Sequence, residues 1–572
     1  MRTPVIVKGP HGAVEISRPR EPVRVGLLVN SFMQPHWVYK IITDIQRSSI
    51  AQVVLIVKLE NFNGKQEKSI SRILRKTNYI LYMTYMALDN YISRVNPNAL
   101  KEMNIEKCIS DCPVIQVRRL TCEDITAIHE YALDIALDFS FQKIRGDIVH
   151  IAKYGVWAYD DECSPLSHRV PSGFWEVMRG QPVTESTLRV LEESGNGKVL
   201  CRSYVATNRF SVKRNRNGFL WNSSSFVLRK INGIYENGSL QLDDEVLDSS
   251  SDMSNPSMQA KPTNFHIFPY LINILGKYCV FYIQNIFCYD QWFIAYKIED
   301  KETYIGDVPH GFKALVSPKG TFWADPFPVK YNDRYFIFTE EYVYKNKKGH
   351  ITVIEMNENL DYKNSTKVLE KDHHLSYPFI FQWCGDYYMI PETAHARSIE
   401  LYRCAAFPFD WKLEKILLSD IKAVDTTLAE INGLWWMFVN VGIDGTSNDV
   451  DLYLFYANTP MGPWKPHKRN PVKSDVRSAR SAGRIFFWQG EMYRPSQDCS
   501  EGYGHAIAIN KIICIDTDRY IEAEVSKILP QWSSNVVANH TLNSCENLTV
   551  IDGMMKTFKG TIPGVSKRNN MY

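Results

Sequence analysis

A short phrase of alternating character recurs through the second half of the chain. In each copy a polar residue opens an apolar strand, a turn follows, and a second strand ends in another polar residue. The five copies open on Asp325, Tyr377, Asp425, Ser481 and His540, roughly 50 to 60 residues apart. A repeat of this length, made of short strands and tight turns, is typical of β-propeller blades. Five copies predict five blades.

The strand pattern also places polar side chains together on one face of this propeller. Neighbouring strands of a blade run antiparallel, so a second strand returns to the face where the first strand began. The residue that opens each copy is then expected to share a rim with the residues that end the second strand. Those second-strand residues are Glu340 or Glu341, Glu392, Asn440, Gln497 with Asp498, and Asp552.

The acidic composition of this rim indicates a functional site. A buried carboxylate is costly unless it is paired or used, and carboxylates gathered from several strands are what glycosidic chemistry or sugar binding requires. The alternative is structural, because aspartate in Asp-Pro and Asp-Thr-Thr sequences caps turns and binds backbone amides. The candidate catalytic residues are Asp325, Glu341, Glu392 and Asp425. The candidate substrate-binding residues are Tyr377, Arg480, Arg494, Gln497, Asp498 and His540, with the two arginines on a phosphate or carboxylate.

Composition limits the remaining possibilities. The 572 residues exceed what one core accommodates, so two or three domains are expected. A net charge of +3 argues against nucleic-acid binding by bulk charge. The twelve cysteines are scattered, and Cys108 and Cys112 have no second pair beside them, so neither a metal nor a cofactor is predicted. The first residues lack the apolar run of a secretory signal, and we expect a cytoplasmic location.

The N-terminal half opens with a strand-helix-strand pattern. Residues 23–30 and 53–59 are apolar runs, and residues 37–47 between them have helical character. This βαβ unit predicts a Rossmann-type α/β domain with a parallel sheet. The expected organisation is an α/β domain at 1–238, a linker at 239–264, an apolar connecting helix at 265–290, the propeller at 291–560 and a tail at 561–572.

Part of the N-terminal domain resembles the formyltransferase fold of methionyl-tRNA and amino-sugar formyltransferases. The resemblance covers Tyr-Gly-Val-Trp-Ala-Tyr-Asp-Asp from residue 154, Pro-Ser-Gly-Phe-Trp from residue 171, and Gly-Lys-Val-Leu from residue 197. In that family an Asn and a His stabilise an oxyanion and an Asp orients the His. Here those positions fall on Ala158, Asp160 and near Lys198. The resemblance implies the fold, whereas formylation and folate binding are not expected.

Residues 265–289 are strongly apolar and aromatic. Asn273, Lys277, Gln284 and Asn285 interrupt the run, so about 18 consecutive apolar residues, the length that spans a bilayer, are not available. We expect a helix packed between the two domains. The alternative is peripheral contact with a membrane, because aromatic residues beside a lysine suit a bilayer interface.

The propeller segment carries the more specific resemblance. Its Trp-Ala-Asp-Pro-Phe start resembles the five-bladed family 43 glycoside hydrolases. With Tyr-Pro-Phe, Pro-Glu-Thr, Arg-Ser-Ala-Gly-Arg, Arg-Pro-Ser-Gln-Asp and His-Thr-Leu-Asn, residues 292–553 look more like the propeller of plant glucosamine inositolphosphorylceramide transferases, and of bacterial proteins that join it to a formyltransferase-like domain. The hydrolase family implies a base at Asp325. Its second and third acids fall on Tyr377 and Asp425, where the third should be a glutamate.

Three functions remain open at this point. The first is an enzyme of glycan or glycolipid assembly that transfers a sugar at the propeller rim, with an activated sugar as donor. Asp325 would be its base or nucleophile, and Glu392 or Glu341 its acid. The second is a carbohydrate-binding or scaffold protein without chemistry. The third is a folate-dependent amino-sugar formyltransferase.

Overall fold

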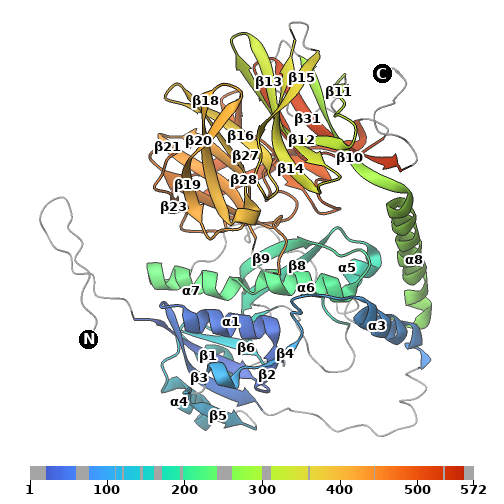
Figure 1. The fold of residues 1–572 in the computed structure, drawn as a ribbon. Coiled ribbons are helices and arrows are strands. Elements are labelled where there is room, and N and C mark those ends of the chain that lie inside the picture. The colour runs from blue at the N-terminus through green and yellow to red at the C-terminus, as the bar shows by residue number, and fades with distance from the viewer. Residues whose placement is uncertain are drawn as a thin grey trace, which may run out of the picture. The chain divides into compact units, whose positions relative to one another are not determined.

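The structure is a computed structural model that describes residues 21–59, 77–109, 111–118, 121–141, 146–159, 170–193, 197–240, 260–298, 311–357, 361–442, 445–532 and 535–559. The chain forms two compact units (Figure 1). The first comprises Met1–Phe174, Ser186–Arg202 and Phe219–Asn264. The second comprises Trp175–Glu185, Ser203–Gly218 and Phe265–Tyr572.

The α/β half is built on a seven-stranded sheet in the order β5-β3-β1-β6-β7-β8-β9, whose last two strands are divided between the units. The pairings β1 to β3, β3 to β5, β1 to β6 and β6 to β7 are parallel, and β7 to β8 is antiparallel. The predicted α/β domain with parallel strands is confirmed, while a formyltransferase fold stays a prediction. The strands of this sheet are β1 Val23–Val29, β3 Ala51–Leu59, β5 Val114–Val117, β6 Ile135–Phe139, β7 Val156–Tyr159, β8 Val183–Val190 and β9 Lys198–Ala206. Two short strands, β2 Met33–Pro35 and β4 Glu102–Asn104, pair with each other in a separate sheet.

The helices of this half form where apolar residues recur at helical spacing. In α1 the residues Trp37, Val38, Ile41, Ile42 and Ile45 are buried, which is the i, i+4 pattern of an amphipathic helix on a sheet. The helices are α1 His36–Arg47, α3 Ile80–Ile92, α4 Cys122–His129, α5 Phe174–Arg179, α6 Val212–Ser223 and α7 Phe226–Asn237. A further helix, α8 Asn264–Phe287, belongs to the second unit from Phe265 onward.

The apolar segment before the propeller forms the predicted helix, α8. Packing of this helix between the two domains stays a prediction. Ile267 is its one buried residue, and residues 275–287 are all exposed. Among the described residues, no helix combines the length and the apolar character needed to cross a membrane.

The second unit contains the predicted five-bladed propeller, which is evident from five sheets in chain order. Within a blade, consecutive strands pair antiparallel across tight turns. The first blade has β12 Thr321–Tyr331, β13 Arg334–Val343, β14 Lys348–Met356 and β15 Tyr362–Leu369, and the second has β16 Ser376–Trp383, β17 Asp386–Glu392, β18 Ser398–Ala406 and β19 Asp410–Ser419. The third blade has β20 Ala423–Ile431, β21 Leu434–Val441, β22 Asp451–Ala457, β23 Lys465–Pro466 and β24 Lys473–Ser474, and the fourth has β25 Phe486–Trp488, β26 Glu491–Asp498, β27 Ala506–Ile515 and β28 Tyr520–Ile528. The fifth blade combines β29 Val536–Ala538, β30 Leu542–Cys545 and β31 Leu548–Phe558 with β10 Cys288–Ile298 and β11 Lys313–Leu315.

The fifth blade closes the ring with strands from both ends of the propeller segment. β10 pairs antiparallel with β31 over its whole length, from Cys288 opposite Phe558 to Ile298 opposite Leu548. The apolar residues 292–296 lie within β10 and so belong to this closing strand. Because this pairing ties the first strand to the last, the ring leaves no open edge at the junction.

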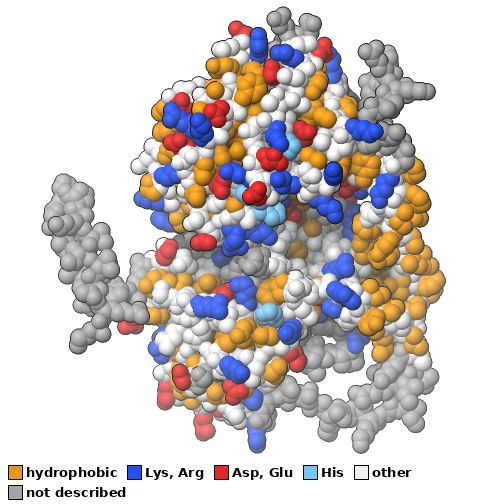
Figure 2. Space-filling model, in the orientation of Figure 1, with side chains coloured by type: hydrophobic (Ala, Val, Ile, Leu, Met, Phe, Trp, Pro, Cys, Tyr) orange, Lys and Arg blue, Asp and Glu red, His pale blue; other side chains and the backbone are white. Residues whose placement is uncertain are grey.

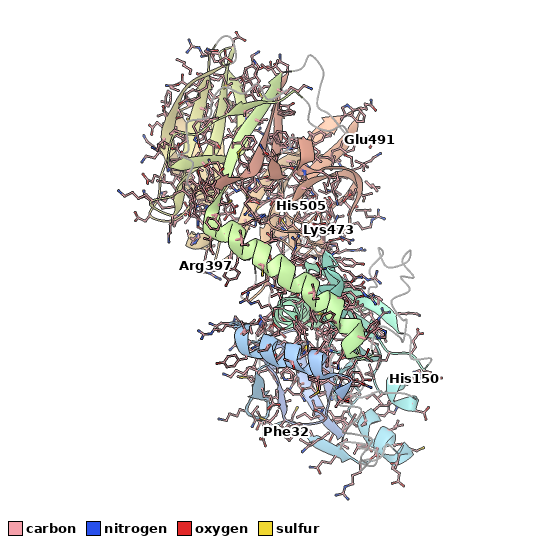
Figure 3. The ribbon with its side chains drawn as sticks, turned by 90° about the vertical axis from the view of Figure 1, so that its right-hand side faces the viewer. Phe32, His150, Arg397, Lys473, Glu491 and His505 are labelled. Carbon is pink, nitrogen blue, oxygen red and sulfur yellow. The ribbon has the colours of Figure 1, made fainter. Side chains whose placement is uncertain are left out.

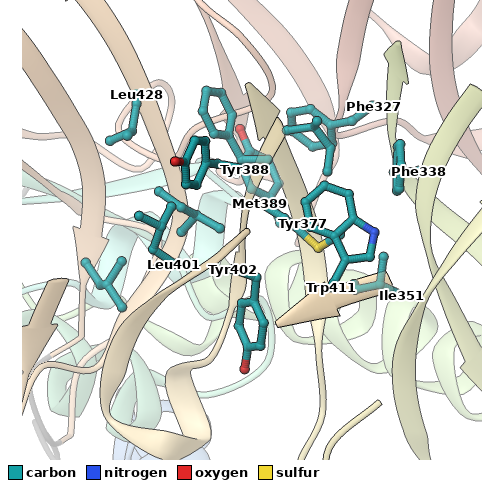
Figure 4. Packing of buried hydrophobic residues seen from close by; sticks show 14 of the residues in the cluster. Phe327, Phe338, Ile351, Tyr377, Tyr388, Met389, Leu401, Tyr402, Trp411 and Leu428 are labelled. Carbon is teal, nitrogen blue, oxygen red and sulfur yellow. The ribbon is translucent and has the colours of Figure 1, made fainter. Parts of the chain in front are cut away.

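Large apolar side chains fill the space between adjacent blades (Figure 4). Phe327 of the first blade meets Tyr377 of the second edge to face, with ring centroids 4.9 Å apart. Trp411 and Met389 lie in the same cluster, so apolar burial fixes the angle between blades. The polar residues that open the blades lie nearer the centre of the ring.

Candidate functional site

A recurring backbone irregularity turns three side chains toward the centre of the propeller. Asp325, Tyr377 and Asp425 occupy the same position in the first strand of blades one to three, and all three have positive φ, at +53°, +42° and +50°. At each of them the pairing with the second strand skips residues, as in a β-bulge. Bulges re-aim side chains, and positive φ is uncommon outside glycine. The conformation recurs with a polar side chain each time, which is typical of a site.

Asp325 is held by hydrogen bonds to two neighbouring blades. Its Oδ1 accepts from the Thr541 hydroxyl at 2.7 Å, and its Oδ2 accepts from the Tyr377 backbone N–H at 3.1 Å. Its own backbone N–H donates to Oδ2 of Asp552 at 3.1 Å. Asp325 is therefore fixed in orientation at the junction of blades one, two and five.

His540 joins this group from the fifth blade. Its Nδ1 lies 2.5 Å from Oδ2 of Asp552, and its Nε2 lies 3.8 Å from Oδ1 of Asp325. Its ring stacks on Trp292 at a centroid distance of 4.1 Å and meets Tyr503 edge to face. Burial alone lowers the pKa of His540, but Asp552 and Asp325 outweigh it and raise the pKa above its ordinary value. A charged imidazole here offsets two buried carboxylates.

Arg480 organises the opposite side of the centre. Its Nε donates to Oδ2 of Asp425 at 2.6 Å, and its Nη1 donates to Oδ1 of Asp449 at 2.7 Å. Its Nη2 lies 3.7 Å from Oε2 of Glu392. The guanidinium also lies over the ring of Tyr503, 4.9 Å from its centroid. One cation therefore contacts three carboxyl groups, which cannot all be ionised without leaving excess negative charge.

The carboxyl groups of the centre do not share one protonation behaviour. Burial raises the pKa of Asp325 to about 6, with His540 acting in the opposite direction. Burial, then the charge of Asp425, raises the pKa of Glu392 well above its ordinary value, and Arg480 only partly compensates. Glu340 is raised in the same way, by burial and then by Asp325. The centre thus holds carboxyl groups whose pKa values are raised for different reasons, and acid-base chemistry uses carboxyl groups whose surroundings set their pKa values apart.

Three residues of the centre could hold a metal ion. One ligand atom from each of Asp325, His540 and Asp552 lies within 4.8 Å of the others. The same atoms already exchange hydrogen bonds, and the backbone N–H groups of His540 and Thr541 satisfy Oδ1 of Asp552 at 2.9 Å each. The donor set would suit a cation, yet its hydrogen bonding is complete without one. The expectation of no metal and no cofactor stays a prediction.

The structure brings most of the predicted site residues together. Asp325, Glu392, Asp425, Arg480 and His540 contact one another as described. Tyr377 joins them through its hydroxyl, which lies 2.8 Å from the Thr427 hydroxyl and accepts the backbone N–H of Gly483 at 2.9 Å. Gln497 is fully buried and donates to Oδ2 of Asp425 at 2.9 Å, so it orients that carboxylate.

Three predicted residues are engaged elsewhere. Glu341 accepts hydrogen bonds from the Trp323 indole at 3.3 Å and the Thr352 hydroxyl at 2.9 Å. Its neighbour Glu340 is the one whose pKa responds to the central carboxylates. Since successive strand residues point to opposite sides, the candidate at this position shifts from Glu341 to Glu340.

Arg494 and Asp498 make the other two corrections. The Arg494 guanidinium is buried and donates to both oxygens of Glu522, at 2.8 and 2.6 Å, and to the carbonyls of Ser478 and Ala479. Asp498 accepts from the Lys527 ammonium at 2.8 Å. Both side chains are committed to ion pairs, so we remove them from the substrate-binding set.

Two residues of the centre escaped the sequence reasoning. Asp449 and Tyr503 lie in the connections after β21 and β26, outside the repeated strands. A repeat pattern predicts strand residues and has no register for loops of different length. The two residues are apparent only from their contacts with Arg480.

The three positions that correspond to the catalytic residues of formyltransferases do not form a group of this kind among the described residues. Ala158 lies in β7, and Lys198 opens β9 with its ammonium 3.9 Å from Glu192. Asp160 lies outside the described residues. Neither described residue offers the amide or imidazole that an oxyanion needs.

Fold and centre together define a five-bladed β-propeller with buried carboxyl groups of unequal acidity around one arginine and one histidine. Residues 313–546 match the family model described as "Glucosamine inositolphosphorylceramide transferase 1, N-terminal". The motif resemblance of the propeller segment is thereby confirmed.

Curated relatives agree with this match. Glucosamine inositolphosphorylceramide transferase 1 of Oryza sativa subsp. japonica is 36% identical over 209 residues, which are 36% of this chain and 28% of the relative. The Arabidopsis thaliana protein of that name is 36% identical over 249 residues, 41% of this chain and 32% of the relative. The chain thus spans less than a third of the length of these relatives.

Solved structures show weaker likeness. A family 117 glycoside hydrolase from Zobellia galactanivorans has 13% identity and a TM-score of 0.31, covering 46% of this chain and 90% of that one. A glycinamide ribonucleotide transformylase 1 from Symbiobacterium toebii has 12% identity and a TM-score of 0.25, covering 39% and 92%. At these TM-scores the likeness adds nothing to the topology.

Proposed function

We propose that the propeller catalyses transfer of a sugar to a glycolipid acceptor during glycolipid assembly. The observation that carries this proposal is the pairing of two carboxyl groups of opposite character in one centre. Burial raises the pKa of Asp325 to about 6, and burial with the charge of Asp425 raises the pKa of Glu392 well above its ordinary value. The names of the curated relatives support a transferase whose acceptor is inositolphosphorylceramide and whose sugar is glucosamine.

In this proposal Asp325 is the base. Its two oxygens are oriented by the Thr541 hydroxyl and the Tyr377 N–H, so a fixed carboxylate faces the acceptor. It removes the proton from the acceptor hydroxyl as that oxygen attacks the anomeric carbon of the donor. The bond from the anomeric carbon to the leaving oxygen breaks in the same step.

Glu392 is the proposed acid. Its proton moves to the leaving oxygen, which balances the proton taken by Asp325. Arg480 donates hydrogen bonds to Asp425 and Asp449 beside it, and the charge of Asp425 contributes to the raised pKa of Glu392. Tyr503, half exposed above Arg480, offers an aromatic face to a sugar ring.

The pH dependence of transfer tests this assignment. We expect kcat/KM to rise as pH increases through about 6, because Asp325 must lose its proton to act as base. It should fall again at higher pH, where Glu392 loses its proton. The measurement is a pH-rate profile with inositolphosphorylceramide in mixed micelles and a panel of nucleotide sugars that includes a glucosamine donor.

The pH-rate profile of Thr541→Ala tests the role of Asp325 separately. The Thr541 hydrogen bond favours ionised Asp325, so its loss should move the acidic limb to higher pH. Thr427→Ala is the matched control, since that hydroxyl contacts Tyr377 rather than Asp325. A profile without an acidic limb, or an acidic limb that Thr541→Ala leaves in place or that Thr427→Ala shifts equally, would contradict the role of Asp325.

A further inference from the structure

Helix α8 exposes apolar side chains to an unusual degree. From Leu275 to Phe287 every residue is exposed, and Phe265 and Leu275 have 86% and 62% of their surface accessible. Hydrophobic side chains gather along this helix on the molecular surface (Figure 2). Exposed apolar patches of this kind mark interaction surfaces. The helix runs without interruption into β10 of the propeller (Figure 3).

The residues of α8 fall into sectors around the helix axis. At 3.6 residues per turn, His266, Asn273, Lys277 and Gln284 lie in one polar stripe about 40° wide, and Asn285 lies about 80° beyond its edge. An apolar face about 140° wide lies elsewhere on the helix. We call this the outer face, and its residues are Phe265, Phe268, Ile272, Leu275, Cys279, Tyr282, Ile283, Ile286 and Phe287.

Aromatic contacts within the second unit use the sector between the polar stripe and the outer face. Trp175 meets Tyr270 with ring centroids 6.0 Å apart. Phe210 meets Tyr278 at 5.6 Å and Phe281 at 5.4 Å. These contacts fix the rotation of the helix about its axis. The helix therefore turns the outer face away from these aromatic contacts.

The charged side chain of α8 itself is positive. The helix contains no Asp or Glu, and Lys277 lies in its polar stripe. Arg179 lies over the ring of Trp175, 5.0 Å from its centroid, beside the Tyr270 contact. Phe210 is followed by Lys213 and Arg214 in the first turn of α6. Cationic side chains beside an apolar aromatic face are the composition of helices that bind anionic lipid surfaces.

A second copy of the chain is the competing occupant. Phe265, Phe268, Ile272, Leu275, Cys279, Tyr282 and Ile286 follow the alternating three- and four-residue spacing of a coiled coil. A coiled-coil seam is narrower than this face and is flanked by charges of both signs, which α8 lacks. The breadth of the face and its single sign of charge favour a lipid surface.

We propose that α8 lies in the plane of a membrane interface that carries anionic lipids, with the outer face among the acyl chains. Lys277, Arg179 and Arg214 then lie at the level of the headgroups. The helix has 24 residues and so extends about 36 Å along the surface. This inference stands on α8 and does not depend on the proposed function.

Vesicle flotation of the full chain tests the proposal. We expect binding to phosphatidylcholine vesicles that contain phosphatidylserine, weaker binding to phosphatidylcholine alone, and weakening by added salt. Leu275→Gln with Ile283→Gln should reduce binding at least about tenfold, because both exposed side chains would leave the acyl region. The matched control is Ile513→Gln with Val525→Gln, two exposed apolar residues of the propeller strands β27 and β28.

Two outcomes would overturn the proposal. The first is vesicle binding that is absent or that the α8 variant leaves unchanged. The second is a dimer in sedimentation experiments that dissociates in the α8 variant, since a second copy would then cover the outer face. Equal binding to both kinds of vesicle would overturn the role of the basic residues. Because the substituted side chains are exposed, the unfolding temperature should not change.

Discussion

Glu392→Gln is expected to lower the turnover of sugar transfer on the order of 10³-fold, with donor affinity changed by less than about twofold. The amide keeps the size and polarity of the side chain but cannot give up a proton. Glu392 lies against Arg480 and Asp425, and burial together with Asp425 keeps it protonated. The variant therefore removes the proposed acid and leaves its surroundings in place. The measurement is steady-state kinetics with calorimetric donor affinity.

Glu341→Gln is the matched control for this variant. Like Glu392, Glu341 lies toward the end of the second strand of its blade, but its carboxylate accepts from Trp323 and Thr352 instead. A glutamine oxygen accepts the same bonds, so turnover should stay within about twofold of the unmodified chain. Similar turnover in the two variants would remove Glu392 from the mechanism.

Arg494→Met should lower the free energy of unfolding of the propeller by about 3 to 5 kcal/mol. Glu522 is buried with Arg494, and the substitution would leave its charge without its bidentate partner. Lys473, 2.8 Å from Oε1 of Glu522, compensates in part. Chemical denaturation monitored by tryptophan fluorescence measures the change. Turnover of the folded fraction should be preserved, because Arg494 does not face the centre.

The acid sensitivity of this ion pair supplies its control. Burial raises the pKa of Glu522, but Arg494 and Lys473 outweigh it and lower the pKa to about 2. A lowered carboxyl pKa contributes stability above the unfolded value of 4.5, and that contribution is lost as pH falls toward 2. Arg494→Met with Glu522→Gln should recover much of the stability at pH 7 and weaken this dependence. If Arg494→Met alone were as stable as the unmodified chain, the assignment of a stabilising ion pair between Arg494 and Glu522 would be contradicted.

The architecture of the propeller was accessible from sequence because each blade repeats one pattern. The spacing of the five copies, which open on residues from Asp325 to His540, predicts the number of blades. The environment of α8 was not accessible in this way. Its apolar composition suits a buried helix and a lipid-facing helix equally, and only the exposure of residues 275–287 separates them.

The members of the candidate site were predictable where strand topology sets their positions. They were not predictable where the direction of a side chain, or a partner distant in sequence, determines whether a residue belongs to the site. The rim argument identified Asp325, Glu392 and His540, whose positions follow from the blade order. The choice between Glu340 and Glu341 depends on the bulge at Asp325, which shifts the register of the pair of strands.

The two arginines of the fourth blade show the limit most plainly. Arg480 and Arg494 are the same residue type and lie close together in the sequence. Arg494 is neutralised by Glu522 on β28, two strands further along the blade. A local pattern contains no information about that partner, so sequence alone cannot separate the structural arginine from the one at the centre.

The central claim is that the propeller performs chemistry at Asp325 rather than only binding a carbohydrate. The most direct test measures donor affinity and single-turnover rate on the same sample of Asp325→Asn, beside Asp498→Asn as a carboxylate paired with Lys527 away from Arg480 and His540. The account predicts that Asp325→Asn binds donor normally and loses the transfer rate on the order of 10³-fold, while Asp498→Asn keeps both. Transfer by Asp325→Asn at the rate of the unmodified chain would contradict it.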